Sequence, residues 1–394
     1  MEINSREFDS AFNKLFIKLG PVFSNDVGYK NAQKYVRGLF GTVGRKNNWQ
    51  ISEYLGESTP YSMQQMLYRG RFSSDAMRDV LRGYVSEEIG EKDGTLVIDE
   101  TGFLKQGKKS CGVQRQYSGT AGRIENCQIG VFLTYASNKG HCPIDRRLYM
   151  PEDWMKDPER RKGAGVPESL EFQTKPQMAL EMVQDATVTE VPYIWVTGDC
   201  VYGDYTELRS WLEEHKKSYV LSVSGKAYVW IGTHQERVGD ILKDLPATGW
   251  FEASCGDGSK GARVYDWLIL EINPGMTMGF KRFLMIRRSK SAPDELRAYI
   301  CFGSVDEPAQ KYIEIAGTRW TVETCFKESK SEVGLDQYEV RSYEGWYKHI
   351  TFACIALALL TVISGHSLDG QSIQEHNPAE SSLEEFKKKR NLRV

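Results

Sequence analysis

Two acidic residues follow short apolar segments in the same way. Asp99 comes directly after the segment 95–98 (TLVI), and Asp199 after the segment 193–198 (YIWVTG). Such segments are typical of buried strands, and open α/β sheets carry their functional groups at the carboxyl ends of strands. Two neighbouring strands of this kind would form a paired-carboxylate site. The alternative, of about equal weight, is two unrelated aspartates in turns.

A third acid lies in a segment of helical pattern that begins near Pro308. Arg319 precedes Glu323 by four residues and Lys330 follows it by seven, which places all three on one face of a helix. Taken alone, this pattern is also typical of a solvated helix with an ordinary ion pair. Three apolar neighbours are expected to pack beneath that face: Trp320, Val322 and Phe326.

The spacing Arg, three residues, Glu, six residues, Lys resembles the signature around the catalytic glutamate of bacterial insertion-sequence transposases of the DDE superfamily. Three further segments resemble one subgroup of that superfamily: VIDETGF at 97–103, GVQRQYSGTAG at 112–122 and GLDQYEVR at 334–341. The similarity extends over residues 40 to 365, most of the chain. One position departs from the wider signature, which has a tyrosine three residues before the arginine where this chain has Ala316.

The resemblance implies a fold and a site. The fold class is α/β: an RNase H-like core interrupted by an all-β insertion, with an N-terminal helical domain. The first and fourth strands of such a core are neighbours, so Asp99 and Asp199 would face each other. Together with Glu323 they would form a catalytic triad that binds metal. Four other acids lie close by in the sequence as alternative candidates: Glu100, Asp204, Glu328 and Glu332.

The chemistry implied by the resemblance is cutting and joining of double-stranded DNA. Two divalent ions about 3.5–4 Å apart can activate the attacking oxygen and stabilise the leaving one. Carboxylate oxygens favour Mg²⁺ or Mn²⁺, and clustered carboxylates repel one another until a cation binds. We therefore expect a DNA transposase that acts, as a homodimer, on the transposon's terminal inverted repeats and on target DNA. The alternatives are a metal-dependent nuclease without strand transfer, a domesticated transposase-derived DNA-binding protein and, more distantly, a glycosidase.

Basic residues gather behind the first aspartate. The segment 104–147 contains eight Lys and Arg residues and two acidic residues, although such a segment is usually just a solvated face. In a DNA-cutting enzyme these side chains, with Arg319 and Lys330, would contact phosphates, which supply affinity but little sequence reading. The DNA contacts predicted within this segment are Lys105, Lys108, Lys109, Arg115 and Arg123.

The N-terminal residues 1–92 have a helical pattern. Apolar residues recur at helical spacing over 8–19 and 77–85, and the short segments 48–55 and 62–68 lie on either side of a turn. This arrangement suits a helix-turn-helix that reads the terminal repeat, but it equally suits a plain helical bundle. Its candidate DNA contacts are Arg45, Lys46, Arg69 and Arg71.

The rest of the chain divides into regions by its pattern of strand-like and helix-like segments. Residues 93–225 alternate strand-like and helix-like segments, which predicts the first part of the core. Strand-like segments separated by Gly and Pro fill residues 226–305, the expected insertion. Residues 306–366 would return to the core with two helices, over 308–330 and 343–363, and residues 367–394 form a polar tail.

Composition limits the other classes. The net charge is −2 and 26% of the residues are charged, which is ordinary for a globular protein. The histidines share no ligand spacing, so zinc is not expected. Scattered cysteines without a signal peptide indicate reduced thiols and a cytoplasmic, nucleoid-associated protein. The longest apolar run, 350–363, is too short to span a bilayer, so we expect a core helix and no membrane.

Overall fold

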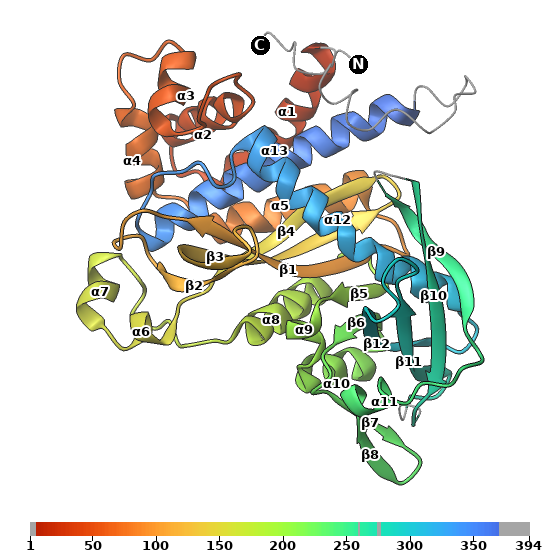
Figure 1. Ribbon diagram of the computed structural model, residues 1–394. Helices are drawn as coiled ribbons and strands as arrows, with labels where there is room; N and C mark the ends of the chain where they lie inside the picture. Colours follow the sequence, from red (N-terminus) through yellow and green to blue (C-terminus); the bar gives the residue numbers. More distant parts are fainter. Residues whose placement is uncertain (1–4, 259–260, 274–276, 370–394) are drawn as a thin grey trace.

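The computed structural model describes residues 5–258, 261–273 and 277–369, in which helices flank one large mixed sheet (Figure 1). The predicted α/β class is confirmed. Ten strands form this sheet: β1 Thr95–Leu104, β2 Gln114–Ser118, β3 Arg123–Ser137, β4 Gly140–Leu148, β5 Trp195–Gly198, β6 Ser218–Val223, β9 Phe251–Gly258, β10 Gly261–Glu271, β11 Phe280–Arg288 and β12 Leu296–Ser304. The strands β7 Tyr228–Ile231 and β8 His234–Arg237 form a separate hairpin.

The strand order explains how distant segments meet. Hydrogen-bonded neighbours follow the path β2-β3-β1-β5-β6-β12-β11-β10-β9, and β4 pairs with β3. The pairs β1–β5 and β5–β6 are parallel, and the other pairs are antiparallel. Because β12 pairs with β6, four strands of the segment 226–305, β9 to β12, extend the main sheet, and only β7 and β8 form a small sheet of their own among the described residues.

The helices cover both faces of the sheet (Figure 1). Five helices precede the first strand, as the N-terminal pattern predicts: α1 Ser5–Leu19, α2 Asp26–Leu39, α3 Asn48–Tyr54, α4 Tyr61–Arg69 and α5 Ser74–Ile89. A 3₁₀ turn, Gly20–Val22, follows α1. The remaining helices are α6 Glu152–Met155, α7 Pro158–Gly163, α8 Lys175–Val188, α9 Cys200–Gly203, α10 Thr206–Glu214, α11 Val238–Ile241, α12 Ala309–Val333 and α13 Tyr343–Asp369.

Strand β1 is longer than the apolar run predicts. It continues five residues past Asp99, because β3 pairs with it along its whole length, from Thr95↔Ala136 to Leu104↔Cys127. The parallel neighbour β5 pairs only as far as Ile98↔Gly198. Asp99 therefore lies in the middle of a strand, at the level where the adjacent strand ends, and the expectation that it closes β1 is wrong.

Helix α13 joins the N-terminal helices to the sheet. It contacts α1, α2, α4 and α5 on one side and β4 on the other. Its buried His349 forms a hydrogen bond through Nδ1 with Tyr35 Oη at 2.8 Å and another through Nε2 with Gly334 O at 3.2 Å, so this histidine has a structural role. Burial lowers the pKa of His349 to about 3.

Helix α13 is longer than the apolar run 350–363, and by length and composition its residues Tyr343–Gly365 could cross a membrane. In the most apolar 18 residues of this segment, 78% of the residues are buried inside the protein, as in a core helix. The N-terminal helices, the sheet and α13 share one hydrophobic core. Most of the predicted polar tail, from residue 370 on, lies outside the described residues.

A buried ion cluster fastens α5 to β4. The Asp145 carboxylate, fully buried, accepts from Arg82 Nη2 at 2.6 Å and from Arg147 Nη1 at 2.8 Å. Its neighbour Arg146 is also buried and donates to Thr351 Oγ1 in α13 at 2.9 Å. Two of the basic residues in 104–147 therefore hold the fold together and do not face solvent.

The substitution Asp145→Asn is expected to destabilise the protein by about 3–5 kcal/mol, because it leaves buried guanidinium groups without their counter-charge. The measurement is urea unfolding followed by circular dichroism. Asp26→Asn is the matched control, since Asp26 pairs with Lys30 on an exposed surface, and it should cost less than about 1 kcal/mol. Equal losses in the two variants would show that the cluster is not stabilising.

Candidate active site

The sheet brings the two predicted aspartates together. Ile98 and Gly198 are paired across the parallel strands β1 and β5. Asp99 and Asp199, the next residue of each segment, therefore lie side by side. Asp199 N-caps the short helix α9, with its Oδ1 accepting from Val201 N at 2.9 Å. Asp99 Oδ1 accepts from Glu100 N at 2.8 Å. The backbone thus holds one oxygen of each carboxylate, and the second oxygen of Asp99 faces Arg319.

Burial and neighbouring acids raise the pKa of both aspartates. Burial, followed by the charge of Asp199, raises the pKa of Asp99 to about 7. Burial, followed by the charge of Glu100, raises the pKa of Asp199. A buried carboxylate with an acidic neighbour is costly to ionise and gains from any cation that binds beside it.

Arg319 links this pair to the third predicted acid. Its Nη1 lies 3.8 Å from Asp99 Oδ2 and its Nη2 donates to Glu323 Oε1 at 3.1 Å. Helix α12 packs against β1 and β5, which puts Arg319 above the carboxyl end of β5. The Glu323 carboxylate is 46% exposed, so it can turn toward or away from the aspartates.

Helix α12 is held in place from both ends. A Cβ added at Gly317 would meet Cys255 O at 1.9 Å, so the helix lies directly against strand β9. At its other end Gly334, with φ 65°, terminates the helix in the left-handed conformation that glycine favours. The strands that extend the sheet therefore support the helix that carries Arg319 and Glu323, and Arg319 reaches Asp99 from it.

The oxygen donors suit a divalent cation, although they do not form a closed cage. Among the residues that the structure describes, no group of three His, Cys, Asp or Glu side chains lies close enough to hold a metal ion by itself. The guanidinium of Arg319 lies between Asp99 and Glu323 instead. Buried carboxylates with raised pKa values fit an ion that brings its own water ligands, as Mg²⁺ does.

The alternative acids have other partners. Glu100 points to the opposite face of β1, where it accepts from Lys175 Nζ at 2.7 Å. Asp204 accepts from Ser224 N at 2.9 Å, and Glu328 pairs with His141 Nε2 at 3.0 Å. Of the acids near Asp99, Glu323 is the one joined to it through an arginine.

Lys330 extends the site along β1. Its Nζ donates to Thr101 Oγ1 at 2.8 Å and to Thr120 Oγ1 at 3.0 Å. The two threonines were not singled out from the sequence, although both belong to segments that resemble the family. Of the apolar residues predicted beneath this helix, Val322 and Phe326 are buried, but Trp320 is 43% exposed.

The predicted basic contacts fall into two groups. The exposed side chains are those of Lys108, Lys109, Arg115, Arg123 and Arg45, and Lys105 is half-buried. Lys46 is different, because it is 8% exposed and its Nζ donates to Leu39 O and to Glu332 O. Its ammonium is occupied by the fold, so Lys46 does not belong among the residues that meet DNA.

Comparison with known proteins identifies the family of the chain. Residues 19–238 match the family described as DDE superfamily endonuclease, and residues 176–359 match the transposase DDE domain. A curated relative, the probable transposase for insertion sequence element IS701 of Microchaete diplosiphon, is 22% identical over 322 residues, covering 81% of this chain and 79% of the relative.

The chain therefore belongs to the DDE superfamily of endonucleases. Within that superfamily it is a DNA transposase of the insertion-sequence kind, an enzyme that breaks and exchanges phosphodiester bonds. The family resemblance seen in the sequence is confirmed.

The raised pKa of Asp99 predicts that the substitution Asp99→Asn increases the stability of the metal-free protein, by an amount that depends on pH. An aspartate whose pKa is higher in the folded state lowers stability as pH rises from about 4, the unfolded value, to about 7, the folded value. Above pH 7 the variant should be more stable than the wild type by about 1 kcal/mol or more, which is the free energy that corresponds to a shift of about one pKa unit. The difference should vanish near pH 4.

Thermal unfolding in the presence of a chelator, from pH 4 to pH 8.5, measures this difference. The exposed Asp153→Asn is the matched control and should leave the transition unchanged at each pH. A wild type as stable as Asp99→Asn at pH 8.5 would contradict the assignment of a strained, buried carboxylate.

Proposed function

We propose that Asp99, Asp199 and Glu323 are the catalytic carboxylates of this transposase and that they hold two divalent ions, Mg²⁺ or Mn²⁺. The observation that carries the proposal is the bridge made by Arg319, which lies 3.8 Å from Asp99 and 3.1 Å from Glu323, with the half-buried Asp199 on the strand next to Asp99. Three acids from distant parts of the chain thereby belong to one electrostatic unit.

We also infer that the sheet contains an RNase H-like core. Strands β4, β3, β1, β5 and β6 lie side by side in this order, with β5 and β6 parallel to β1. Leaving the short β2 aside, the first and fourth strands are neighbours, as that fold requires. The core would comprise residues 93–225 and 306–366, with 226–305 as the β insertion, 1–92 as the DNA-binding domain and 367–394 as a tail.

The reaction has two stages. In cleavage at a transposon end, a water oxygen bonds to phosphorus while the bond from phosphorus to the 3′-oxygen breaks, and the oxygen takes up a proton to leave a 3′-hydroxyl. In strand transfer, the oxygen of that hydroxyl would bond to a phosphorus of target DNA while the bond from this phosphorus to the target's own 3′-oxygen breaks, and the leaving oxygen would take up a proton to become a 3′-hydroxyl. When bound, divalent ions would lower the pKa of the attacking oxygen and would stabilise the negative charge that develops on the leaving oxygen.

The chain's own groups orient the substrate for these stages. Asp99 and Asp199 are fixed by backbone hydrogen bonds, and their repulsion favours the binding of cations. Arg319 can exchange its carboxylate partners for a DNA phosphate, since guanidinium binds both. Lys330, anchored on Thr101, would hold the next phosphate.

The partners of the enzyme follow from this chemistry. It would bind double-stranded DNA at the terminal inverted repeats and at a target. Two copies would be needed to pair two ends, so a homodimer on DNA is proposed. The work would take place in the cytoplasm, at the nucleoid.

The central test changes Asp99→Asn, Asp199→Asn and Glu323→Gln one at a time. Each variant should lose Mg²⁺-dependent cleavage of a terminal-repeat duplex by at least about 10²-fold, because a lost ion contact removes several kcal/mol of transition-state stabilisation. Duplex binding should remain within about threefold. Pre-cut ends, assayed for joined product, separate a transposase from a nuclease without strand transfer.

Matched controls lie on the same elements. Asp204→Asn and Glu328→Gln remove acids whose carboxylates have other partners, so both should cleave at nearly the wild-type rate. Unchanged cleavage by any one of the three central variants would remove that residue from the triad.

A further prediction concerns Arg319. The variant Arg319→Gln should bind Mn²⁺ several-fold more tightly in the absence of DNA, because no guanidinium competes for Asp99 and Glu323. It should nevertheless cleave more slowly, because a phosphate contact is lost. Calorimetry at pH 8.5, where Asp99 is ionised, measures the first effect, and weaker Mn²⁺ binding by the variant would contradict the bridge.

A further inference from the structure

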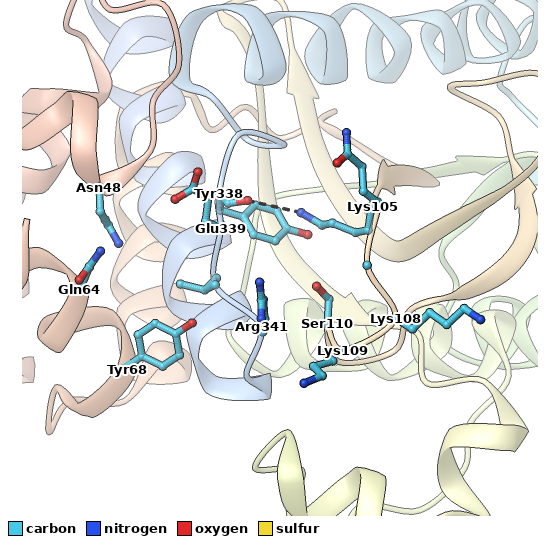
Figure 2. Close-up of a pocket in the computed structure, with 13 residues that line it drawn as sticks. Asn48, Gln64, Tyr68, Lys105, Lys108, Lys109, Ser110, Tyr338, Glu339 and Arg341 are labelled. Atoms are coloured by element: carbon cyan, nitrogen blue, oxygen red, sulfur yellow. Dashed lines mark hydrogen bonds between the residues drawn. The ribbon is translucent and has the colours of Figure 1, made fainter.

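A second candidate site lies away from the carboxylates. It is a cavity of about 780 Å³ between the helices α3 and α4, the loop that follows β1, and the chain that joins α12 to α13 (Figure 2). We call it the basic cleft. Three segments that are distant in the sequence form its walls, so it exists only in the folded protein.

One wall of the basic cleft is strongly positive. Lys108 and Lys109 lie on the loop after β1, and Arg341 lies on the chain before α13 (Figure 2). All three side chains are exposed, and in the part of the chain that the structure describes none of them has a salt-bridge partner. The acid on this wall, Glu339, already accepts from Asn47 Nδ2 at 3.2 Å.

The facing wall carries polar groups without partners. Asn48 is 8% exposed, and its Oδ1 finds no hydrogen-bond donor among the described residues. Gln64 and Tyr68 stand one helical turn apart on α4, the second of the two short helices around a turn. Amides and a phenol hydroxyl are groups that read base edges, whereas unpaired cations bind phosphates.

A line of cations connects the basic cleft to the aspartates. Thr101 and Phe103 share the face of β1 that carries Asp99, because alternate residues of a strand point the same way. Lys105 follows directly after the last residue of the strand. Lys330 lies over Thr101, and Lys105 Nζ lies 3.5 Å from the centre of the Tyr338 ring. Asp99 and Lys105 are separated by about 20 Å at 3.3 Å per residue.

We infer that the basic cleft seats the duplex of the transposon end about six base pairs from the cleaved bond. This inference rests on the proposed function. A separation of about 20 Å corresponds to about six steps of 3.4 Å along one DNA strand. Lys108, Lys109 and Arg341 hold the sugar-phosphate backbone, and Gln64 and Asn48 face the bases.

The test uses the full-length protein and two duplexes of equal length, one with the element's own terminal repeat and one with the same bases scrambled. In fluorescence anisotropy the double variant Lys108→Ala/Lys109→Ala should bind both duplexes about tenfold or more weakly near 0.1 M salt. Its slope of log affinity against log salt should fall by about two. Gln64→Ala should weaken binding of the terminal repeat alone.

Position is tested with single methylphosphonates, which remove one phosphate charge. A neutral linkage four to eight base pairs from the cleavage site should weaken wild-type binding but leave the double variant unaffected. The matched control is Lys30→Ala/Lys156→Ala, two lysines paired with acids on exposed helices, and it should behave as the wild type does. Circular dichroism checks that every variant is folded.

Failure of this inference is distinguishable from failure of the proposed function. Normal binding by Lys108→Ala/Lys109→Ala, or a sensitive phosphate elsewhere along the duplex, overturns the inference, while metal-dependent cleavage by the same protein would leave the function standing. Conversely, a protein that does not cleave but loses duplex affinity in the double variant keeps the cleft and refutes the catalytic role.

Discussion

The site depends on one electrostatic constraint: two carboxylates held side by side in a buried part of the sheet. The parallel pairing of β1 with β5 fixes Asp99 next to Asp199, and the backbone gives neither of them room to move apart. Repulsion and burial oppose ionisation, as the raised pKa values record. A cation resolves the conflict, and in this structure Arg319 fills that place beside Asp99. We propose that the same conflict gives the protein an affinity for divalent ions.

The rest of the architecture serves to place the Arg319 guanidinium. Helix α12 carries both Arg319 and Glu323, and it lies close against β9 at Gly317. Strands β9 to β12 therefore support helix α12. On the other side, α13 packs on β4 and on the N-terminal helices, so the helices that would bind DNA share a core with the catalytic sheet. Removing residues 1–92 would expose the apolar face of α13, so point variants on α3 and α4 are the cleaner probes of DNA recognition.

Much of this could be predicted from the sequence, and the misses have physical causes. Apolar runs ending in Asp and the spacing of Arg319, Glu323 and Lys330 located the acids, and helical periodicity located the N-terminal helices and α12. The end of β1 was missed because pairing with β3, and not local hydrophobicity, sets its length. The burial of Lys46 and Arg146 could not be foreseen, since a basic residue's partners are distant in the sequence: Glu332 O for one and Thr351 for the other. The basic cleft was invisible for the same reason, because three remote segments build it.

The most direct test of the central claim is the position of Mn²⁺ in a crystal of the protein with its transposon-end DNA, located by anomalous scattering. The account predicts ions about 2.2 Å from oxygens of Asp99 and Asp199, with Glu323 turned toward them and Arg319 moved onto a phosphate. Manganese bound elsewhere, or Arg319 still joined to Asp99 while the ions are present, would contradict it.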